Sequence, residues 1–595
     1  MRRSIATVCV SGTLDDKLTA AAAAGFDGIE LFENDLVVSP WSPAELRARC
    51  ADLGLSIDLY QPFRDFEAVP PELLKENLRR ARLKFDVMAE LGADTMLVCS
   101  SVSPHAADDD GLAASQLSTL ASLAAERGIR IAYEALAWGR HVSTWDHAWR
   151  IVQAAGHPAL GLCLDSFHIL SREVSPDGIA AITPGKIFFV QLADAPHLRM
   201  DVLQWSRHHR LFPGQGTFDL PGLITTIQAS GYDGPLSLEV FNDVFRQSDP
   251  ARTAIDAMRS LVALEDRAGL RPLPPAPALG RHAFTEIAVD GDTGPQLREA
   301  LHGLGFTHTG QHRTKPVELW EQSACRVVLN SAVTRPGAAI SAFAVTADDP
   351  DTALRRAEAL LAPARVGAHG PRETSLASLT APDGTEVFIT GDEWRADFLP
   401  TGDQPGPGAG LTAVDHIGLT QPFDHFDEAG LFYDSVLGLE RLPTQEYAAP
   451  FGLMRSLGLA TADRGVRLAL PASLLRRGDW APGVIAPQHV AFSTSDVLTA
   501  AARLRGWTLT IPDNYYADLA ARYALTDQAV EDLRAHGILY DRDAHGGELL
   551  HFYTPVHGGR VFFEVVERRG GYDGFGEANT PVRMAAHRHL RLTGG

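Results

Sequence analysis

Eight short β-rich segments alternate with amphipathic helical segments over the first 265 residues, and this alternation constrains the fold more than any other feature. The β-rich segments are Ser4–Val10, Gly28–Phe32, Leu55–Tyr60, Thr95–Cys99, Ile129–Glu134, Leu160–Asp165, Ile187–Leu192 and Leu236–Val240. Helical segments such as Leu14–Ala24 and Glu72–Leu91 separate them and are followed by glycines that suit a left-handed helix cap. Eight such units predict an α/β protein with a closed (β/α)₈ (TIM) barrel. A doubly wound open sheet fits less well, because no glycine-rich phosphate loop is present.

Two segments rich in proline and glycine divide the 595-residue chain. Residues 271–280 contain four prolines, which favour an extended backbone and cannot continue a helix. Residues 400–410 combine proline with glycine, which disfavours regular structure. We therefore expect three domains, at 1–268, 283–399 and 411–595.

The second and third domains share a sequence pattern. Three segments of the second domain match three of the third in order: Phe284–Val289 with Val414–Leu419, Ile340–Val345 with Pro487–Phe492, and Val387–Thr390 with Val561–Glu564. Such internal similarity predicts tandem βαβββ modules, an α+β fold.

Composition excludes several classes of partner and location. The formal charge of −21 and the lack of Lys/Arg runs argue against a nucleic-acid partner. The apolar runs are strand-sized and too short to cross a membrane, and the N-terminal residues do not form a secretory signal, so we expect a cytoplasmic protein. The five cysteines form no CxxC pair and are expected to be buried and free. The oligomeric state stays open, a homo-oligomer included.

Four side chains with oxygen donors end four of the later β-rich segments. They are Glu134, Asp165, Gln191 and Glu239. The carboxyl ends of barrel strands meet at one mouth, where three carboxylates would repel one another without a cation. Oxygen donors favour Mg²⁺ or Mn²⁺ over zinc, with Co²⁺ as a further candidate. The alternative is that these acids are hydrated in loops or cap helices.

The motifs of this region together resemble one family. GFDGIELFEND, YQPFRDFE, YEALAWGRHV, LDSFHIL, FVQLADAP, HHRLFPGQG and LEVFND are spread over residues 1–265. They resemble the bacterial 3-dehydroshikimate dehydratases, within the xylose-isomerase-like barrels. The resemblance implies that the four strand-end residues bind the metal, and that the partner is a small molecule, 3-dehydroshikimate, which is converted into protocatechuate. Gln191 departs from the wider superfamily, in which histidine is common at this position.

This reaction removes a proton α to a ring ketone and expels a β-hydroxyl, so it needs a proton-transferring group near the metal. His168, three residues after Asp165, is the candidate acid or base; its alternative role is to support a metal ligand. Arg64 and Arg210 are the candidates for pairing with the substrate carboxylate. Three further residues are expected to line the pocket: Tyr60, Ser206 and His208.

A second candidate metal site lies in the third domain. His416 and His489 occupy matching strand positions in its two halves, and Glu564 ends its last strand. Two histidines and one carboxylate form the facial triad of non-haem Fe(II) oxygenases, whereas a single buried histidine is more often a packed core residue. The aligned residues of the second domain do not form such a triad: Glu286, Ala342 and Thr390.

Residues 284–580 resemble 4-hydroxyphenylpyruvate dioxygenase, a vicinal-oxygen-chelate fold, through motifs such as VDHIGL, QHVAF, IPDNYYADL and GRVFFEVVERRGGYDGFGEAN. The resemblance implies Fe²⁺, or else Mg²⁺, on His416, His489 and Glu564. Two positions depart from it. His551 stands where the family usually has glutamine, and Thr580-Pro581 stands where it has phenylalanine. We therefore expect metal binding with little or no oxidation of 4-hydroxyphenylpyruvate.

Three functions stay open at this stage. The first is a dehydratase with an accessory C-terminal half, and the second is a bifunctional protein whose C-terminal half is also an Fe(II) dioxygenase. The third is a sugar isomerase or inosose-type dehydratase barrel with a C-terminal binding module. Arg64 and Arg210 favour a carboxylated substrate over a neutral sugar.

Overall fold

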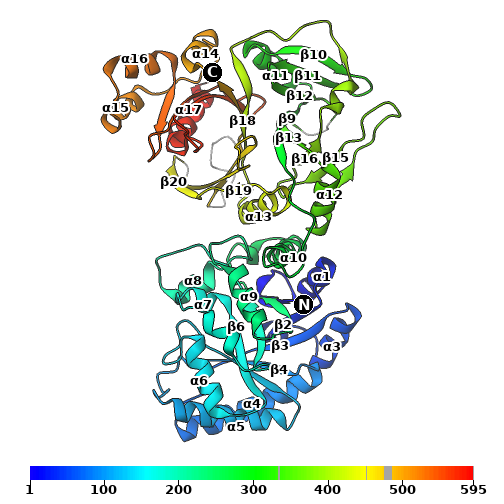
Figure 1. The fold of residues 1–595 in the computed structure, drawn as a ribbon, viewed down its shortest axis with the longest axis vertical. Helices are drawn as coiled ribbons and strands as arrows, with labels where there is room; N and C mark the ends of the chain where they lie inside the picture. Colours follow the sequence, from blue (N-terminus) through cyan, green and yellow to red (C-terminus); the bar gives the residue numbers. More distant parts are fainter. Residues whose placement is uncertain (333–335, 451, 475–485, 594–595) are drawn as a thin grey trace. The chain divides into compact units, whose positions relative to one another are not determined.

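The computed structural model describes residues 1–332, 336–450, 452–474 and 486–593. They form two compact units, Met1–Leu273 and Pro274–Gly595 (Figure 1). The boundary lies in the predicted proline-rich segment, after helix α10 (Pro250–Arg267) and before strand β9 (Leu279–Ala288). The further division of the second unit into two domains stays a prediction.

The first unit is a closed barrel of eight strands in the order β1 to β8, so the predicted (β/α)₈ fold is confirmed. Each strand is parallel to the next, and β8 pairs with β1. The strands are β1 (Arg3–Ala6), β2 (Gly28–Phe32), β3 (Ser56–Phe63), β4 (Thr95–Cys99), β5 (Arg130–Glu134), β6 (Leu160–Asp165), β7 (Ile187–Leu192) and β8 (Leu236–Leu238). Three strands are shorter than predicted, and one of them, β5, is shorter by a single residue. Thr7–Cys9 form a 3₁₀ turn rather than more of β1, and β8 ends one residue before Glu239.

Helices surround these strands (Figure 1). The longer ones are α1 (Leu14–Ala24), α3 (Pro43–Asp52), α4 (Pro71–Leu91), α5 (Asp110–Ala125), α6 (Trp145–Ala155), α9 (Leu220–Ala229) and α10, and the short ones are α2 (Glu33–Val37), α7 (Ser166–Leu170) and α8 (Val202–His208). Helix α1 shows how the sequence sets their limits. Thr13 and Asp16 form a capping box at its start, and Gly25 ends it with a φ of +90°.

Side chains that alternate along the strands fill the barrel. Leu59, Leu97, Ala132 and Phe189 belong to one buried cluster, which also includes Cys99 and Cys163. All five cysteines of the chain are buried and free, as predicted.

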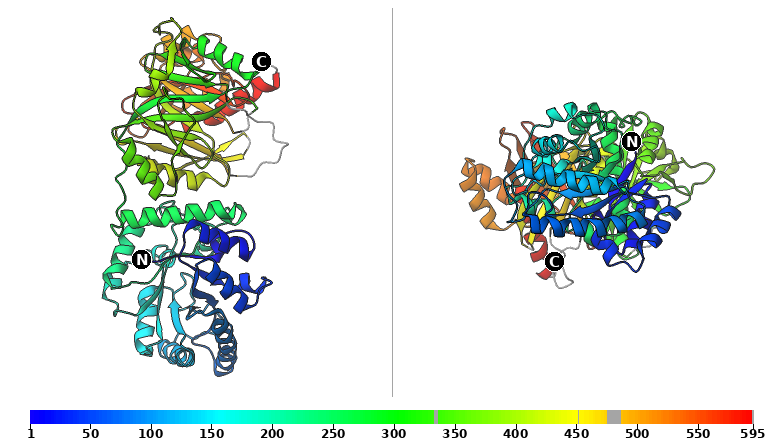
Figure 2. Two further views of the ribbon diagram at one scale, coloured as in Figure 1. Left: turned by 90° about the vertical axis from the view of Figure 1, so that its right-hand side faces the viewer. Right: turned by 90° about the horizontal axis from the view of Figure 1, so that it is seen from below.

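The second unit contains two sheets of nine strands. The first has β9, β10 (Thr307–His312), β11 (Val317–Gln322), β12 (Cys325–Asn330), β13 (Ala339–Ala347), β14 (Arg365–Val366), β15 (Ala377–Thr380), β16 (Glu386–Thr390) and β17 (Phe398–Pro400), with helices α11 (Thr293–Gly303) and α12 (Pro350–Ala359). The second has β18 (Leu411–Leu419), β19 (Glu440–Arg441), β20 (Gln445–Ala449), β21 (Gly452–Ala460), β22 (Arg467–Ser473), β23 (Gln488–Thr494), β24 (Leu539–Arg542), β25 (Glu548–Tyr553) and β26 (Val561–Arg569). Its helices are α13 (Phe426–Leu437), α14 (Val497–Arg503), α15 (Asp513–Arg522), α16 (Asp527–His536) and α17 (Thr580–Thr593). Helix α17, red in Figure 2, packs beside β20.

The two sheets share one topology, which confirms the predicted tandem modules. The central order β16-β13-β9-β12 of the first corresponds to β26-β23-β18-β22 of the second, with parallel outer pairs and an antiparallel central pair in both. Their central registers differ. Glu286 pairs with Ala342 in the first sheet. His416, which aligns with Glu286, pairs with Ala491, two residues beyond the expected match His489.

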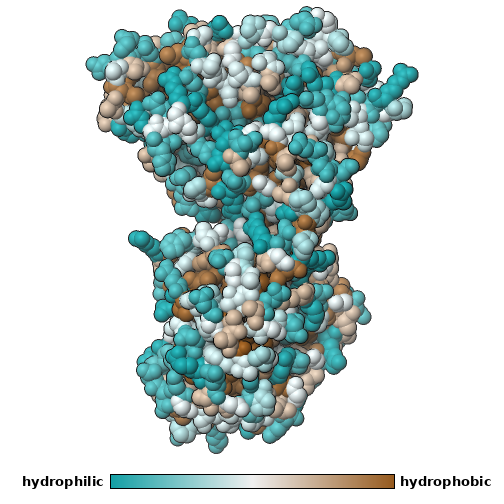
Figure 3. Space-filling model, in the orientation of Figure 1, coloured by the Kyte–Doolittle hydropathy of each residue, from teal (hydrophilic) through white to brown (hydrophobic). Residues whose placement is uncertain are grey.

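In the part of the chain that the structure describes, no helix is long and apolar enough to cross a membrane. On the face drawn in Figure 3, hydrophobic residues lie in small groups among hydrophilic ones. The cytoplasmic location stays a prediction.

Candidate active site and metal centre

The four predicted barrel ligands lie at the carboxyl ends of neighbouring strands. Glu134 ends β5 and Asp165 ends β6, where Asp165 pairs with Gln191 of β7. Glu239 directly follows β8. All four are buried, with at most 5% of each residue exposed. The barrel therefore gathers their side chains at one mouth, as the strand-end pattern predicts.

Arg210 adds a buried cation to this cluster. Its Nη1 donates to Asp165 Oδ2 at 2.8 Å and to Glu239 Oε2 at 3.0 Å. Its Nε and Nη2 both donate to Ser206 Oγ, at 3.2 and 2.9 Å. The ring of Phe167 lies 4.7 Å from the guanidinium carbon. Arg210 thus bridges two predicted metal ligands, and Ser206 holds it in place.

His168 lies next to the same carboxylates. Helix α7 begins after Asp165, whose Oδ1 accepts the backbone N–H of His168 at 3.1 Å. This cap brings His168 Nε2 to 3.8 Å from Glu134 Oε1 and 3.9 Å from Asp165 Oδ2. The other ring nitrogen, Nδ1, accepts the N–H of Ala137 at 3.2 Å. Ligand atoms of Glu134, Asp165 and His168 all lie within 4.8 Å of one another, a spacing that one metal ion can bridge.

The electrostatics of this cluster also fit a cation. Glu134 Oε1 is buried and has no hydrogen-bond partner among the described residues. Burial, with repulsion from Asp165 and Glu239, raises the pKa of Glu134 well above its usual value. Burial likewise raises the pKa of Glu239 to about 7, although Arg210 opposes this. Burial lowers the pKa of His168 to about 4, so its imidazole is neutral at pH 7.

The sequence reasoning missed Glu30, in the middle of β2. Glu30 is fully buried and accepts hydrogen bonds from Gln61 Nε2 at 2.9 Å, from Gln191 Nε2 at 2.5 Å and from the Ser237 hydroxyl. The amide nitrogen of Gln191 is therefore hydrogen-bonded to Glu30, and its Oε1 accepts a hydrogen bond from Cys163 Sγ at 3.3 Å. An acid inside the apolar segment GIELF is the sequence signal that could have revealed this residue.

Two predicted pocket residues are placed elsewhere. The hydroxyl of Tyr60 donates to Glu33 of α2 at 3.3 Å, and Lys84 of α4 lies 6.0 Å from its ring, so Tyr60 faces the helices. Irregular pairing of β2 with β3 at Glu30, and of β3 with β4 beyond Tyr60, makes the inward positions hard to predict from alternation. His208 pairs with Asp243 at 3.0 Å, and its side chain is 40% exposed. The structure does not bring either residue into the cluster.

Arg64 directly follows β3 and is half-buried. Its positive charge contributes to lowering the pKa values of His168 and Glu239, although burial has the larger effect on both groups. Arg64 therefore lies within electrostatic range of the cluster.

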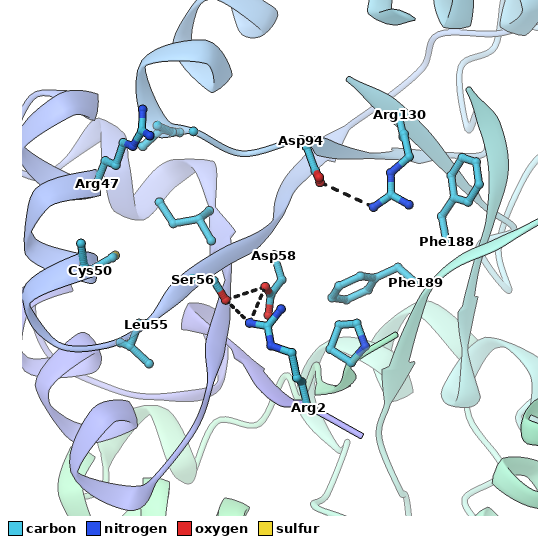
Figure 4. Close-up of a pocket in the computed structure, with 15 residues that line it drawn as sticks. Arg2, Arg47, Cys50, Leu55, Ser56, Asp58, Asp94, Arg130, Phe188 and Phe189 are labelled. Carbon is cyan, nitrogen blue, oxygen red and sulfur yellow. Dashed lines mark hydrogen bonds and ion pairs between the residues drawn. The ribbon is translucent and has the colours of Figure 1, made fainter. Parts of the chain in front are cut away.

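A cavity of about 420 Å³ lies at the opposite end of the barrel strands (Figure 4). Its charged side chains pair with one another: Arg2 with Asp58 at 3.1 Å and Arg130 with Asp94 at 3.6 Å. None of the predicted catalytic residues lines this cavity.

In the second sheet of the C-terminal unit, the predicted triad converges. His416 Nε2 and His489 Nε2 are 3.1 Å apart, and they lie 3.4 and 3.3 Å from Glu564 Oε2. The three residues come from β18, β23 and β26, which are neighbours in the sheet. His416 and Glu564 are buried, at 2% and 1% exposure. Three ligand atoms so close together can coordinate one metal ion.

Two triad residues have buried hydrogen-bond partners. Asp415 Oδ1 bonds His416 Nδ1 at 2.7 Å and is itself held by Arg568 at 2.8 Å. Glu564 Oε1 bonds His551 Nδ1 at 2.6 Å. Burial alone would raise the pKa of Glu564, but its bonds to His416, His489 and His551 lower that pKa well below the usual value. Burial lowers the pKa of His489 to about 4, so this ligand is neutral at pH 7.

The structure also describes the two positions, His551 and Thr580, at which the chain departs from the dioxygenase pattern. His551 is fully buried, and its Nε2 accepts from Asn579 Nδ2 at 2.9 Å. Thr580 begins α17. The ring of Phe575 packs edge-on against His416 at 5.0 Å.

Comparisons with known proteins agree with both halves. Residues 18–261 match the family described as xylose isomerase-like TIM barrel. A 3-dehydroshikimate dehydratase of Pseudomonas putida is 43% identical over 98% of this chain and 98% of its own length. One from Pseudomonas aeruginosa is 44% identical over 99% of each. A solved structure described as a xylose isomerase-like TIM barrel/4-hydroxyphenylpyruvate dioxygenase fusion protein is 42% identical, covers 99% of this chain and 100% of its own, and has a TM-score of 0.91.

Proposed function

The chain belongs to the 3-dehydroshikimate dehydratases, and we propose that its barrel carries out this dehydration at the cluster around Glu134, Asp165 and His168. The reaction converts 3-dehydroshikimate into protocatechuate and water. A proton α to the ring ketone is removed, a β-hydroxyl leaves, and tautomerisation gives the aromatic ring. The observation that carries the proposed site is the convergence of these three buried groups within 4.8 Å.

Four residues are proposed to hold a divalent cation, Mg²⁺ or Mn²⁺, with Co²⁺ as a further candidate: Glu134, Asp165, Gln191 and Glu239. The unpartnered Glu134 Oε1 and the raised pKa values of Glu134 and Glu239 support a cation in this place. When bound, such a cation stabilises negative charge that develops on the ketone oxygen. Glu30 orients Gln191 by accepting its amide N–H, which leaves the Gln191 oxygen on the side away from Glu30.

His168 is proposed to donate a hydrogen bond to the departing hydroxyl, which leaves as water together with the proton removed from the carbon α to the ketone. Its Nδ1 accepts the N–H of Ala137, so the neutral ring has its proton on Nε2, the nitrogen nearest Glu134 and Asp165. Its low pKa, about 4, keeps the ring in this neutral form at pH 7. The substrate would accept that hydrogen bond from a fixed direction, because the α7 cap holds the backbone of His168.

Arg64 is proposed to bind the substrate carboxylate. Arg210, the other candidate, is fully engaged with Asp165, Glu239 and Ser206 and supplies positive charge to the cluster itself. Arg64 makes no hydrogen bond or ion pair with any residue that the structure describes. Its guanidinium is therefore available for a bidentate bond to a carboxylate.

Ultraviolet spectroscopy tests this proposal directly. The purified full-length protein with 3-dehydroshikimate and Mg²⁺ should form the aromatic product, and a chelator should stop its formation until Mg²⁺ is restored. Turnover of a neutral sugar in place of 3-dehydroshikimate would favour the isomerase alternative.

A second site is proposed in the C-terminal unit, where His416, His489 and Glu564 would bind Fe²⁺ or Mg²⁺. The interatomic distances of 3.1–3.4 Å support this proposal. Two features argue against oxidation of 4-hydroxyphenylpyruvate. His551 is hydrogen-bonded to Glu564, and position 580 is threonine instead of phenylalanine. Metal analysis of the wild type and of His416→Ala tests whether the triad binds a metal.

A further inference from the structure

Three of the five cysteines lie beside the proposed barrel ligands. Cys99 ends β4, Cys163 lies within β6, and Cys9 ends the 3₁₀ turn that follows β1. All three are free, and each is at most 3% exposed. They share no sequence motif, so only closure of the barrel brings each of them to the proposed metal site.

The thiol of Cys99 contacts the first of these ligands, Glu134. The two residues pair directly across β4 and β5, and Cys99 Sγ donates to Glu134 Oε2 at 3.3 Å. A buried thiol beside a carboxylate stays protonated, because a thiolate would add a second negative charge there. The other carboxylate oxygen, Oε1, has no partner among the described residues. Cys99 therefore holds one oxygen of Glu134 and leaves the other for a cation.

The thiol of Cys163 makes a corresponding contact with Gln191. Its Sγ donates to Gln191 Oε1 at 3.3 Å, and Glu30 accepts from the amide nitrogen of the same side chain at 2.5 Å. The carbonyl oxygen of an amide has two lone pairs, so the thiol leaves one for a metal. Gln191 is thus fixed at both ends of its amide.

Cys9 acts on the main chain at Glu239. Its Sγ donates to the carbonyl oxygen of Leu238 at 3.4 Å and accepts the N–H of Val240 at 3.0 Å. These residues stand immediately before and after Glu239, which follows the last residue of β8. One thiol therefore bridges the backbone on either side of a proposed ligand.

The other two cysteines have no such contact. Cys50 lies on α3 at 1% exposure, and Cys325 begins β12 at 0% exposure. Neither side chain makes a hydrogen bond with any residue that the structure describes. Burial alone therefore does not account for the thiol hydrogen bonds at the barrel mouth.

We propose that the three thiols at the mouth are positioning residues, which orient three of the four proposed ligands for a divalent cation. A thiol is a weak hydrogen-bond donor, so it fixes the direction of a ligand and leaves most of the ligand's negative charge to the cation. A charged donor such as an ammonium group would compete for that charge. Hydrogen bonds that support metal ligands raise the affinity of a site for its metal. The inference rests on the metal site of the proposed function.

Binding of Mn²⁺ to the full-length protein tests these roles without a measurement of turnover. The parent carries His416→Ala, which silences the C-terminal triad, and is titrated with Mn²⁺ by isothermal titration calorimetry. The binding that is lost on adding Glu134→Ala defines the barrel site. We expect Cys9→Ala, Cys99→Ala and Cys163→Ala each to weaken this binding about ten-fold, the lower end of the effect of removing a group that supports a metal ligand.

Matched variants separate positioning from packing. Cys50→Ala removes an equally buried thiol that contacts no ligand, and it should leave the Mn²⁺ affinity unchanged. Cys99→Ser and Cys163→Ser keep a donor and should restore the affinity to within about three-fold of the parent. If an alanine variant does not fold, Cys99→Val or Cys163→Val lacks the donor as well and should show the same loss relative to serine.

Each cysteine is judged by its own variant. Unchanged Mn²⁺ affinity on removal of the thiol, or an equal loss in the serine and alanine variants, overturns its positioning role. A loss of the same size in Cys50→Ala also overturns the inference, because any buried cysteine would then have this effect.

The outcome can be separated from the fate of the proposed function. Dehydration of 3-dehydroshikimate is measured in parallel on the wild type. A protein that dehydrates, and whose alanine variants bind Mn²⁺ as the parent does, overturns this inference alone. A protein that does not dehydrate, but whose alanine variants lose Mn²⁺ affinity as expected, supports the inference and overturns the proposed function. Absence of any Mn²⁺ binding that depends on Glu134 overturns the inference and the metal assignment together.

Discussion

The barrel cluster and the C-terminal triad are both candidate metal sites, but their ligand side chains have different hydrogen-bond and charge partners. In the barrel, Glu134 Oε1 has no hydrogen-bond partner among the described residues, and Arg210 lies between Asp165 and Glu239 as a counter-charge. In the C-terminal unit, His416 and Glu564 are each held by a buried partner, Asp415 and His551. The first site is a cluster of three carboxylates that a divalent cation would stabilise, whereas the second is a preorganised set of two histidines and one carboxylate. We therefore expect the barrel to prefer hard cations and the triad to prefer borderline metals.

The largest expected effect is in the barrel. Glu134→Ala or Glu239→Ala should lower the rate of aromatic product formation by about 10²–10³-fold or more, because each removes a charged ligand of the proposed cation. The rate is measured by ultraviolet absorbance with saturating Mg²⁺. Circular dichroism serves as the fold control, and metal bound by the C-terminal unit should not change. Near-wild-type turnover in chelator-treated buffer would show that this metal assignment is wrong.

The reciprocal change should affect only the second site. His416→Ala should weaken metal binding by the C-terminal unit by at least about a hundred-fold, since it removes a ligand rather than a supporting group. Dehydration should stay close to wild type. An oxygen electrode with Fe²⁺ and 4-hydroxyphenylpyruvate should record little or no O₂ consumption by either protein. Steady consumption that His416→Ala abolishes would contradict this expectation and establish a second enzyme.

A smaller effect is expected from Arg64. Arg64→Ala should lower kcat/KM for 3-dehydroshikimate by about ten-fold to a hundred-fold, the usual range for one charge-assisted hydrogen-bonded contact. Arg64→Lys should recover part of the loss. Steady-state kinetics at fixed Mg²⁺ measure both variants. If the kinetics of Arg64→Ala are unchanged, Arg210 becomes the candidate for binding the substrate carboxylate.

Truncation should have the smallest effect. A chain that ends at Leu273 keeps every proposed dehydratase residue and all of α10. Its kcat/KM should stay within a few-fold of the full-length value, because the barrel has its own core. Thermal denaturation shows whether the shortened chain is less stable. A folded barrel without activity would mean that the C-terminal unit contributes to the dehydratase site.

The sequence predicted the barrel well because its strands are short, apolar and regularly spaced. Four of the eight predicted strands coincide with the observed limits, including Thr95–Cys99 and Ile187–Leu192. The proposed ligands lie within one residue of the carboxyl ends of β5 to β8, so chain order alone places them at one mouth. His416, His489 and Glu564 were also recoverable, because the duplicated pattern marks equivalent positions.

The residues that sequence reasoning misplaced depend on contacts between distant strands. Glu30 gains its three partners from β3, β7 and β8, which meet only when the barrel closes. The inward positions of β3 depend on irregular pairing that strand alternation does not reveal, which is why Tyr60 was assigned to the pocket.

The duplicated sheets have a consequence for protein design. Grafting the triad onto the first sheet would take Glu286→His, Ala342→His and Thr390→Glu, yet these changes would not rebuild it. Glu286 accepts hydrogen bonds from Ser341 and Asn330, and Ala342 is buried at 2% exposure, where an imidazole would be much larger than the methyl group that it replaces. The central strands also pair in different registers in the two sheets, so the grafted side chains would face different neighbours. A second metal site in this sheet would therefore require a change in the pairing register of a central strand, and not only the exchange of three residues.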